Sequence, residues 1–278
     1  MASHPPQSVD FWTEVVDRAD AALASGAMHS FECALEFVED AGVEFVLRVA
    51  TKFPKGETAK GRSDDAPKLP RDPFANPDPA LIVAELTATH RVLLNKFSVV
   101  REHLLIVTRD YQEQRSPLTA SDFEALALVM KDVEVLAFYN GGREAGASQA
   151  HRHLQVVSLP LSPRHSVPMD VLCDPAKTRL PFRHAFARLA PGQVARPPDM
   201  LGTYLALHRE AGLEFPQPYN LLVTHEWMLV VPRSRDKFED ISINSLAFAG
   251  SFFIRDAKHA HAIVAARPMN VLKSVAMP

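Results

Sequence analysis

The sequence predicts an α+β fold, in which helices pack on an antiparallel β-sheet of at least five strands. Segments with the alternation of strands are mixed with segments of helical spacing, without regular strand–helix–strand alternation. Two pairs of alternating segments are each joined by a short turn, which is typical of hairpins. With 278 residues, 47% of them hydrophobic, the chain is long enough to bury a sizeable core.

The first elements are predicted to be a helix, a hairpin and a long loop. Residues 9–24 place apolar side chains at helical spacing. Residues 31–38 and 43–49 alternate in polarity, with an Asp-Ala-Gly turn between them. Residues 52–79 contain six prolines among small and polar residues, so we expect a loop there.

The middle of the chain has the clearest pattern. Residues 91–100 and 103–108 are predicted to be two buried strands, and residues 136–139 and 150–159 two more. The sequence Ser-Asp-Phe-Glu at 121–124 has the spacing of a capping box, which predicts that a helix begins there.

The distal part begins with a proline-rich connector. Ten prolines fall between residues 160 and 218, where only residues 201–211 are predicted to be helical. Residues 219–224 and 228–231 form a second predicted hairpin. The apolar run 243–254 predicts a further helix.

Composition and charge exclude several classes of protein. Thirty basic against 33 acidic residues give a net charge of −3, which argues against a dedicated nucleic-acid binder. No apolar run approaches the roughly 20 residues of a membrane helix, and no secretory signal is visible, so we expect a cytoplasmic protein without membrane partners. The two cysteines, Cys33 and Cys173, form no CxxC pattern, which argues against a disulfide framework or a cysteine zinc site.

A cluster of glycines precedes the most informative strand. Three of the 11 glycines lie within six residues, ending at Gly146. Residues 146–149 combine small side chains, backbone N–H groups and a hydroxyl, which suits the close approach of a phosphate. On the strand that follows, His151, His153 and Gln155 alternate and therefore project from one face. Three polar side chains on one face of a largely apolar strand cost stability unless they have a function or bonding partners.

Three interpretations of the two histidines stay open on spacing alone. They are surface residues of an edge strand, two ligands of a zinc site, or a catalytic pair in which one imidazole attacks a phosphorus atom. The zinc interpretation lacks third and fourth ligands, since Gln155 is a poor one and no cysteine lies nearby. The preceding glycine-containing segment favours nucleophilic catalysis, with N–H donors holding the phosphate oxygens.

The pattern Asn140-x5-Gly146-x-Ser148-x2-His151-x-His153-x-Gln155 resembles the nucleotidyltransferase branch of the histidine-triad superfamily. More narrowly, the chain is similar to the diadenosine tetraphosphate phosphorylases, also called ATP adenylyltransferases. The similarity is strong over residues 80–161, clear over 218–255 and loose before residue 56. The segments that carry it are 93–97, 103–109, 138–142, 219–222, 230–234, 241–244 and 248–250.

The resemblance implies a histidine-triad-like fold and reversible phosphorolysis of diadenosine tetraphosphate by phosphate to ATP and ADP, through an adenylylated histidine. His153, in the middle of the triad, is then the nucleophile, and His151 orients nearby groups. Gln155 takes the place of a third histidine and holds phosphate oxygens as a neutral amide. The attacking imidazole must be neutral, which the ordinary pKa of histidine, about 6.5, allows at cytosolic pH.

The resemblance also implies a set of residues that bind the substrate. We expect these to be Lys52, Asn95, Lys96, Asn140, Gly146, Ala147, Ser148, Gln149, Asn244, Ser251 and Arg255. Asn95 matches an asparagine that meets the ribose in the wider superfamily, and Asn140 would fix a phosphate or the surroundings of the nucleophile. No metal and no bound cofactor are expected, although Mg²⁺ can accompany the nucleotide in the reverse direction.

Several other conspicuous residues receive a structural interpretation. His103 is predicted to be a structural residue at the start of its strand, and residues 233–237 a solvated turn. His259 and His261 form a second alternating pair, but they lie in an Ala-rich segment without a glycine loop, so no function is assigned to them.

The expected organisation has three parts. Residues 1–161 form a catalytic part with the histidine-triad motif, 162–217 a proline-rich connector, and 218–278 a part that completes the fold. The expected partners are small nucleotides, namely diadenosine polyphosphates, ATP and ADP, together with phosphate. The alternatives are hydrolysis, transfer of the adenylyl group to another acceptor such as sulfate or a sugar phosphate, and a non-catalytic nucleotide-binding sensor.

Overall fold

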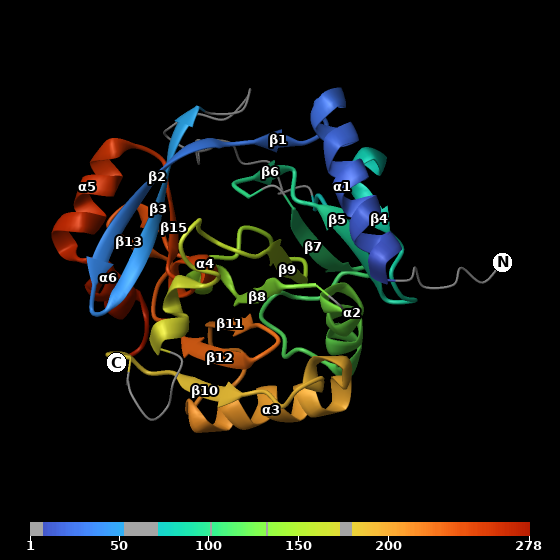
Figure 1. Ribbon diagram of the computed structural model, residues 1–278. Coiled ribbons are helices and arrows are strands. Elements are labelled where there is room, and N and C mark those ends of the chain that lie inside the picture. Colours follow the sequence, from blue (N-terminus) through green and yellow to red (C-terminus); the bar gives the residue numbers. More distant parts are fainter. Residues whose placement is uncertain (1–7, 53–71, 101, 132, 173–179) are drawn as a thin grey trace.

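The computed structural model describes residues 8–52, 72–100, 102–131, 133–172 and 180–278. Most of the predicted loop 52–79 therefore lies outside the described residues, as does Cys173. The described elements comprise one large sheet, one smaller sheet and six α-helices, together with short two-stranded pairings and 3₁₀ turns (Figure 1).

Eight strands form the large sheet, and every neighbouring pair in it is antiparallel. In spatial order they are β10 (Ala185–Arg188), β12 (Trp227–Pro232), β11 (Tyr219–Val223), β8 (Val135–Gly141), β9 (His153–Ser158), β7 (His103–Thr108), β5 (His90–Leu94) and β4 (Ile82–Ala84). Strand β9 thus lies at the centre. It begins at His153, so the predicted strand 150–159 starts three residues too early and His151 precedes the strand. The predicted antiparallel sheet of at least five strands is confirmed, and so is the hairpin β11–β12.

The smaller sheet has three strands. They are β15 (Ser251–Ile254), β3 (Val43–Lys52) and β2 (Glu32–Asp40), and β15 runs parallel to β3. The predicted hairpin is confirmed as β2–β3, whose turn holds Ala41 and Gly42 at positive φ. Two short pairings complete the strands: β1 (His29–Ser30) with β6 (Phe97–Ser98), and β13 (Lys237–Phe238) with β14 (Ile241–Ser242).

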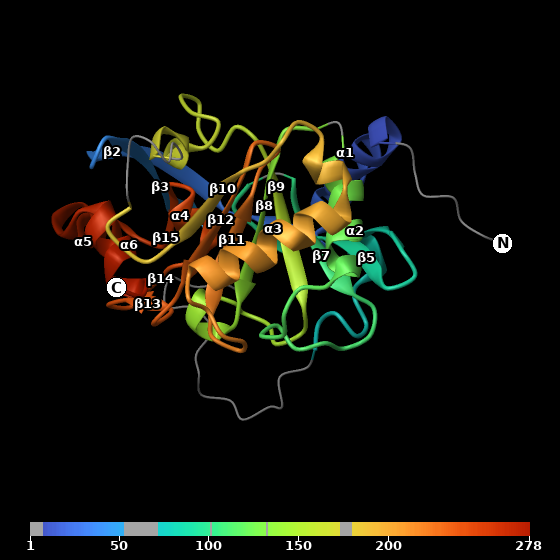
Figure 2. The same cartoon turned by 90° about the horizontal axis from the view of Figure 1, so that it is seen from below.

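Helices cover the sheets from both sides (Figures 1 and 2). They are α1 (Ser8–Ser25), α2 (Ala120–Met130), α3 (Pro197–Glu210), α4 (Ser245–Phe248), α5 (Ala257–Ala266) and α6 (Pro268–Val275), with 3₁₀ turns η1 (Pro79–Leu81), η2 (Arg143–Ala145), η3 (Pro168–Leu172) and η4 (Gln193–Ala195). Over the described residues, none of these helices combines the length and apolar character of a membrane span.

One face of the large sheet is closed by α1, α2 and α3. Strand residues such as Leu154 and Val156 of β9 share one apolar cluster with Val15 of α1, Phe123 of α2 and Tyr204 of α3. Figure 2 shows α3 running across the strands. Burial of this face supplies most of the driving force for folding, because stabilisation scales with the apolar area removed from water.

The opposite face is divided between two coverings. Over β8, β11 and β12 it packs against the small sheet and α4–α6, through residues such as Phe138, Leu222 and Phe252. Over β5 and β7 a separate small cluster takes its place, in which Phe74 packs on Leu105 and other strand residues. The polar side chains of β9 project from the sheet beside this second cluster.

The predicted helix over 243–254 is wrong. The chain forms only the short helix α4, turns at Gly250 with φ 93°, and continues as strand β15 beside β3. A Cβ at Gly250 would lie 2.6 Å from Pro168, so glycine is required there. An apolar run of this length is compatible with both structures, and pairing with a distant strand decides between them.

Two boundaries also differ from the prediction. Helix α2 begins at Ala120 with Thr119 as its N-cap, and Asp122 accepts a hydrogen bond from the Thr119 N–H at 2.7 Å. The capping box therefore lies two residues before the predicted one. The predicted strand 91–100 is two strands, β5 and β6, separated by Asn95 and Lys96.

Candidate active site

His153 is the first residue of β9 and is buried, with 3% of its surface exposed. Its Nδ1 lies 2.8 Å from the carbonyl oxygen of His151. A carbonyl oxygen only accepts hydrogen bonds, so Nδ1 carries the proton in the neutral ring. The lone pair is therefore on Nε2, the nitrogen that can attack an electrophile.

The charge state of His153 fits that role. Burial lowers the pKa of His153 to about 4; the charge of His151 acts in the same direction and the hydrogen bond to the His151 carbonyl in the opposite one. Burial disfavours the charged imidazolium because it removes the water that solvates it. The ring is therefore neutral at pH 7, as the nucleophile interpretation requires.

His151 lies outside β9, in an isolated bridge to Glu113. Its Nδ1 is 2.8 Å from Oδ2 of Asp72, and its Nε2 is 2.8 Å from the carbonyl oxygen of Thr108 and 3.0 Å from its Oγ1. The ring of Phe74 packs against both histidines, at centroid distances of 5.8 Å from His151 and 5.1 Å from His153. Both nitrogens of His151 are engaged, which leaves no unoccupied ring nitrogen for an attack.

Gln155 ends a chain of hydrogen bonds that links strands β9 and β7 to Asn95, the residue after β5. Its Oε1 is 2.8 Å from Nε2 of His103, and Nδ1 of His103 is 3.1 Å from Nδ2 of Asn95. Burial lowers the pKa of His103 to about 4, so its ring is neutral and has one donor and one acceptor. Asn95 then donates to His103, and His103 donates to Gln155. Among the residues that the structure describes, the NH₂ group of Gln155 has no partner and can therefore donate to a ligand.

The glycine-rich loop after β8 is formed by a short 3₁₀ turn. Gly146 ends it with φ 91°, and a Cβ there would lie 2.9 Å from Cβ of Asn244 and from the carbonyl oxygen of Ile243. The N–H groups of Gly146 and Ala147 bond to carbonyls inside the loop. The remaining predicted loop residues are Ser148, which is exposed, and Gln149, which is half-buried. Within the described part of the chain these two make no hydrogen bonds, which leaves their polar groups for a ligand.

A buried polar network lies beneath this loop. Oδ1 of Asn140 accepts from Nδ2 of Asn220 at 2.9 Å and from Oγ of Ser245 at 2.8 Å, and Asn220 also donates to the carbonyl of Ala145. Nη1 of Arg233 donates to Oδ1 of Asn220. Asn140 thus fixes the surroundings of the loop through protein partners.

Arg233 is fully buried, so the prediction of a solvated turn over 233–237 is wrong for this residue. Its guanidinium donates to the carbonyl oxygens of Ala145, Arg235, Ile243 and Val275 in addition to Asn220. Burial lowers the pKa of Arg233 to about 9, although the charge of Asp236 acts against this. The partners range from Arg235, two residues away, to Ala145, 88 residues away, and no local pattern in the sequence signals them.

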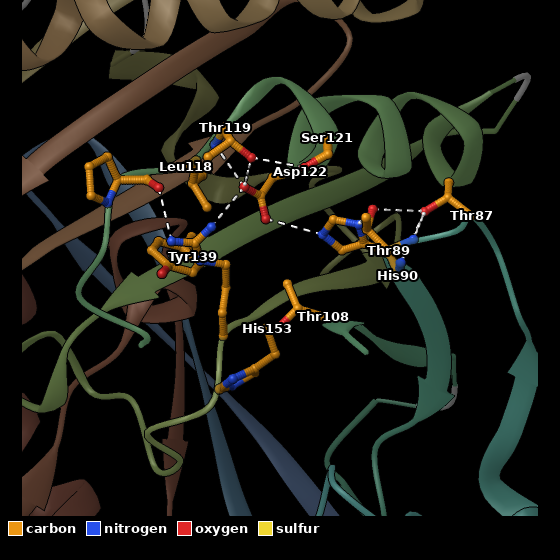
Figure 3. A network of polar contacts seen from close by, with 12 residues as sticks. Thr87, Thr89, His90, Thr108, Leu118, Thr119, Ser121, Asp122, Tyr139 and His153 are labelled. Carbon is orange, nitrogen blue, oxygen red and sulfur yellow. Dashed lines mark hydrogen bonds and ion pairs between the residues drawn. The ribbon is translucent and has the colours of Figure 1, made fainter. Parts of the chain in front are cut away.

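Behind the histidines lies a second buried network. Asp122 is fully buried and accepts from the guanidinium of Arg152 at 3.1 Å and from the N–H and hydroxyl of Thr119, both at 2.7 Å. Nε2 of His90 lies 3.2 Å from its other oxygen. Figure 3 shows Asp122 between Thr119 and His90, with His153 below. The alternation of β9 correctly predicts that Arg152 points away from the histidines.

The remaining predicted site residues lie elsewhere or on the surface. Lys52 is exposed and pairs with Glu32 at 2.7 Å, and Lys96 is exposed above the ring of Phe97. Ser251 lies on β15, not on a helix, and its hydroxyl accepts from Nε of Arg48 at 3.1 Å. Arg255 follows the same strand and is half-buried. Asn244 caps α4 by accepting from the Leu246 N–H at 3.1 Å and touches Gly146 as described above.

No group of His, Cys, Asp and Glu side chains within the described ranges could hold a metal ion. What the arrangement offers is a neutral imidazole with one free nitrogen, a free amide donor and a glycine-containing loop. A nucleophile supported by fixed donors is suited to group transfer at phosphorus. The fold and the site define a histidine-triad-like enzyme of the nucleotidyltransferase class.

Two family models cover almost the whole chain. The model "Ap4A phosphorylase N-terminal domain" matches residues 2–175, and "ATP adenylyltransferase C-terminal domain" matches residues 178–278. The chain therefore belongs to the Ap4A phosphorylase family of enzymes, where Ap4A is diadenosine tetraphosphate. This agrees with the family resemblance of the motif.

Two yeast proteins and one solved structure agree with this family membership. Diadenosine tetraphosphate phosphorylase 2 of Saccharomyces cerevisiae is 34% identical over 227 residues, which cover 66% of this chain and 69% of that protein. Protein APA1 of the same yeast is 28% identical, with 73% and 71% covered. The crystal structure of yeast Ap4A phosphorylase Apa2 in complex with Ap4A is 27% identical, covers 97% of this chain and 98% of that one, and superposes with a TM-score of 0.79.

Proposed function

We propose that this protein catalyses the reversible phosphorolysis of diadenosine tetraphosphate to ATP and ADP, with His153 as the nucleophile. The observation that carries the proposal is the state of His153, a neutral imidazole whose Nδ1–H is held by a carbonyl and whose Nε2 has the lone pair. Membership of the Ap4A phosphorylase family supplies the substrate class.

The proposed reaction has two steps at the same phosphorus atom. Nε2 of His153 attacks an α-phosphorus of diadenosine tetraphosphate, the P–N bond forms, and the P–O bond to the departing ATP breaks. An oxygen of inorganic phosphate then attacks the adenylyl phosphorus, the P–N bond breaks, and ADP leaves. The proton stays on Nδ1 throughout, hydrogen-bonded to the carbonyl oxygen of His151, and the neutral imidazole is restored. No redox partner is needed, because the electron pair of the broken P–O bond leaves with the oxygen of the departing nucleotide.

Fixed polar groups would hold the phosphates during both steps. We assign the free NH₂ of Gln155 to a phosphate oxygen of the adenylyl group, because its carbonyl is already occupied by His103. The polar groups of Ser148 and Gln149 would hold the remaining phosphates, with Gly146 and Ala147, whose N–H groups bond inside the loop, lining the site. Asn95 would meet the ribose. Any Mg²⁺ would arrive with the nucleotide in the reverse direction. The proposed ligands are small nucleotides, and cytoplasmic localisation stays a prediction.

Replacing the nucleophile tests this assignment. His153→Ala removes the only atom proposed to form the P–N bond, so phosphate-dependent ATP release from diadenosine tetraphosphate should fall by about a thousandfold or more. His261→Ala is the matched control, since this exposed histidine belongs to the second alternating pair and should leave the rate unchanged. Undiminished turnover by His153→Ala would refute the nucleophile, and absence of ATP release by the unaltered enzyme would refute the reaction.

A further inference from the structure

A side chain from a loop occupies a gap in the middle of the large sheet. The ladder between β8 and β9 runs from Val135 opposite Ser158 to Phe138 opposite Gln155 and then stops. Beyond that point β8 continues to pair with β11, but its other edge no longer meets β9. The gap lies beside His153, where β9 begins.

The amide of Gln114 fills this gap. Its Oε1 lies 2.8 Å from the backbone nitrogen of His153, and its Nε2 lies 3.2 Å from the backbone oxygen of His153 and 2.9 Å from that of Asn140. This one side chain thus bonds to the backbone of His153 at β9 and of Asn140 on β8, in place of the hydrogen bonds that the two strands would make with each other. Both backbone polar groups of the proposed nucleophile are held by a single amide.

The orientation of this amide is fixed from every side. Gln114 is 3% exposed, its backbone N–H donates to the carbonyl of Ala150 at 2.8 Å, and its carbonyl accepts from the hydroxyl of Tyr139. The backbone N–H of His153 requires an acceptor, while the two carbonyls require donors. Only one of the two amide orientations meets these requirements, so the group has no equivalent alternative position.

We propose that Gln114 is a positioning residue for the chemical step, holding the backbone of His153 so that Nε2 points at the α-phosphorus. This rests on the proposed function, which makes His153 the nucleophile. The residue touches neither substrate nor reacting atoms, and it acts through the backbone from which the imidazole projects. Small displacements of a reacting group lower rates steeply, by about a hundredfold for 1 Å. Its effect therefore belongs in the rate of adenylyl transfer and not in substrate affinity.

Two variants change the amide with little change in shape. Gln114→Glu keeps an acceptor for the His153 N–H but directs an oxygen at two carbonyls, and Gln114→Met removes all three hydrogen bonds. The matched control is Tyr204→Phe, which loses the buried bonds of Tyr204 to Leu118 and Tyr219 on the far face of the sheet. All three variants lose buried hydrogen bonds, but only the Gln114 variants loosen His153.

The experiment is a single-turnover measurement with excess enzyme, in which ATP release from diadenosine tetraphosphate is followed without phosphate and then with it. Competent sites are counted separately, from the ATP released in one burst when diadenosine tetraphosphate is in excess and phosphate is absent, so the rate refers to folded, active protein. KM is taken from steady-state turnover with phosphate. We expect both Gln114 variants to lower the first-order rate per site by about 10- to 100-fold, with KM changed by less than about threefold. Tyr204→Phe should lower the unfolding temperature and keep the rate per site.

The outcomes separate the two proposals. If the unaltered enzyme releases no ATP, the proposed function fails. If the unaltered enzyme is active and the Gln114 variants keep its rate per site while losing only stability, Gln114 is structural and the inference is overturned. A rise in KM at constant rate would overturn it as well, because it would place Gln114 in substrate binding. Should Gln114→Met fail to fold, Gln114→Glu carries the same test.

Discussion

Two buried arginines lie beneath the two halves of the site, and their partners differ. Arg152 lies behind the histidine strand and is neutralised by Asp122 at 3.1 Å. Arg233 lies beneath the glycine-rich loop, where its guanidinium donates to carbonyl and amide oxygens. Within the described residues no carboxylate contacts it, and Asp236 acts on it at longer range.

The difference shows that one sheet provides two electrostatic environments, a neutral one behind the nucleophile and a positive one beneath the glycine-rich loop. A neutralised pair fixes the histidine strand without placing a net charge beside the nucleophile. An arginine held by neutral oxygens leaves a cation beneath the loop expected to hold phosphates, and a buried charge acts over a longer distance than a solvated one. Burial of an ion is expensive in both cases. All three guanidinium nitrogens of Arg233 donate hydrogen bonds, whereas Nε of Arg152 is buried without a partner among the described residues.

The largest expected effect on stability comes from replacing Arg233. Arg233→Met leaves several buried carbonyls without donors, so the free energy of unfolding in urea should fall by about 4 kcal/mol, and Arg233→Lys, which keeps the charge but fewer bonds, by about 2 kcal/mol. Arg235→Met is the control, since that exposed side chain bonds only to the Ser274 carbonyl and should change stability by under about 0.5 kcal/mol. Equal losses of stability in Arg233→Met and Arg235→Met would contradict the role given to the buried Arg233 network.

A somewhat smaller loss of stability is expected on replacing Asp122. Asp122→Asn leaves the charge of Arg152 without a counter-ion, which should lower the free energy of unfolding at pH 7 by about 3 kcal/mol. The adenylyl-transfer rate should fall as well, because Arg152 joins the two histidines in sequence. Asp199→Asn, which breaks an exposed pair with Arg196, is the control and should leave the unfolding midpoint unchanged.

Acid titration sharpens the Asp122 prediction. Burial by itself raises the pKa of Asp122, but the hydrogen bond with His90, the charge of Arg152 and the Thr119 donors together bring it below its ordinary value. The folded state therefore releases this proton more readily than the unfolded chain, whose carboxyl has a pKa of about 3.9. The resulting stability is present above about pH 4 and is lost as the pH falls through the folded value. The unaltered protein should lose more stability below pH 4 than Asp122→Asn, and identical slopes would contradict this.

The sequence predicts well what depends on local periodicity. Strand alternation places His153 and Gln155 on one face of β9 and directs Arg152, the residue before β9, to the opposite side. The two hairpins follow from their turn residues. The run 243–254 fails because an apolar stretch fits a helix and a strand equally, and the turn at Gly250 and pairing with β3 decide the outcome.

Long-range polar contacts are what the sequence cannot reveal. Gln114 lies in a loop without pattern, and its importance appears only when β8 and β9 separate around it. His103 and Arg233 fall inside segments that match the family, and this match points to a functional region. Neither position, however, indicates the residue that its side chain contacts, which is Gln155 for His103 and Asn220 for Arg233. Such contacts join residues 13 to 52 positions apart, and their burial strengthens them.

The most direct test of the central claim is to incubate the unaltered enzyme with diadenosine tetraphosphate, with and without inorganic phosphate, and to separate the products. If His153 forms a covalent adenylyl intermediate, phosphate should yield ATP and ADP in equal amounts, turnover after turnover. Without phosphate the enzyme should release one ATP per site and keep the adenylyl group. Continued release of ATP and AMP without phosphate would contradict the account, because water and not phosphate would then be the acceptor.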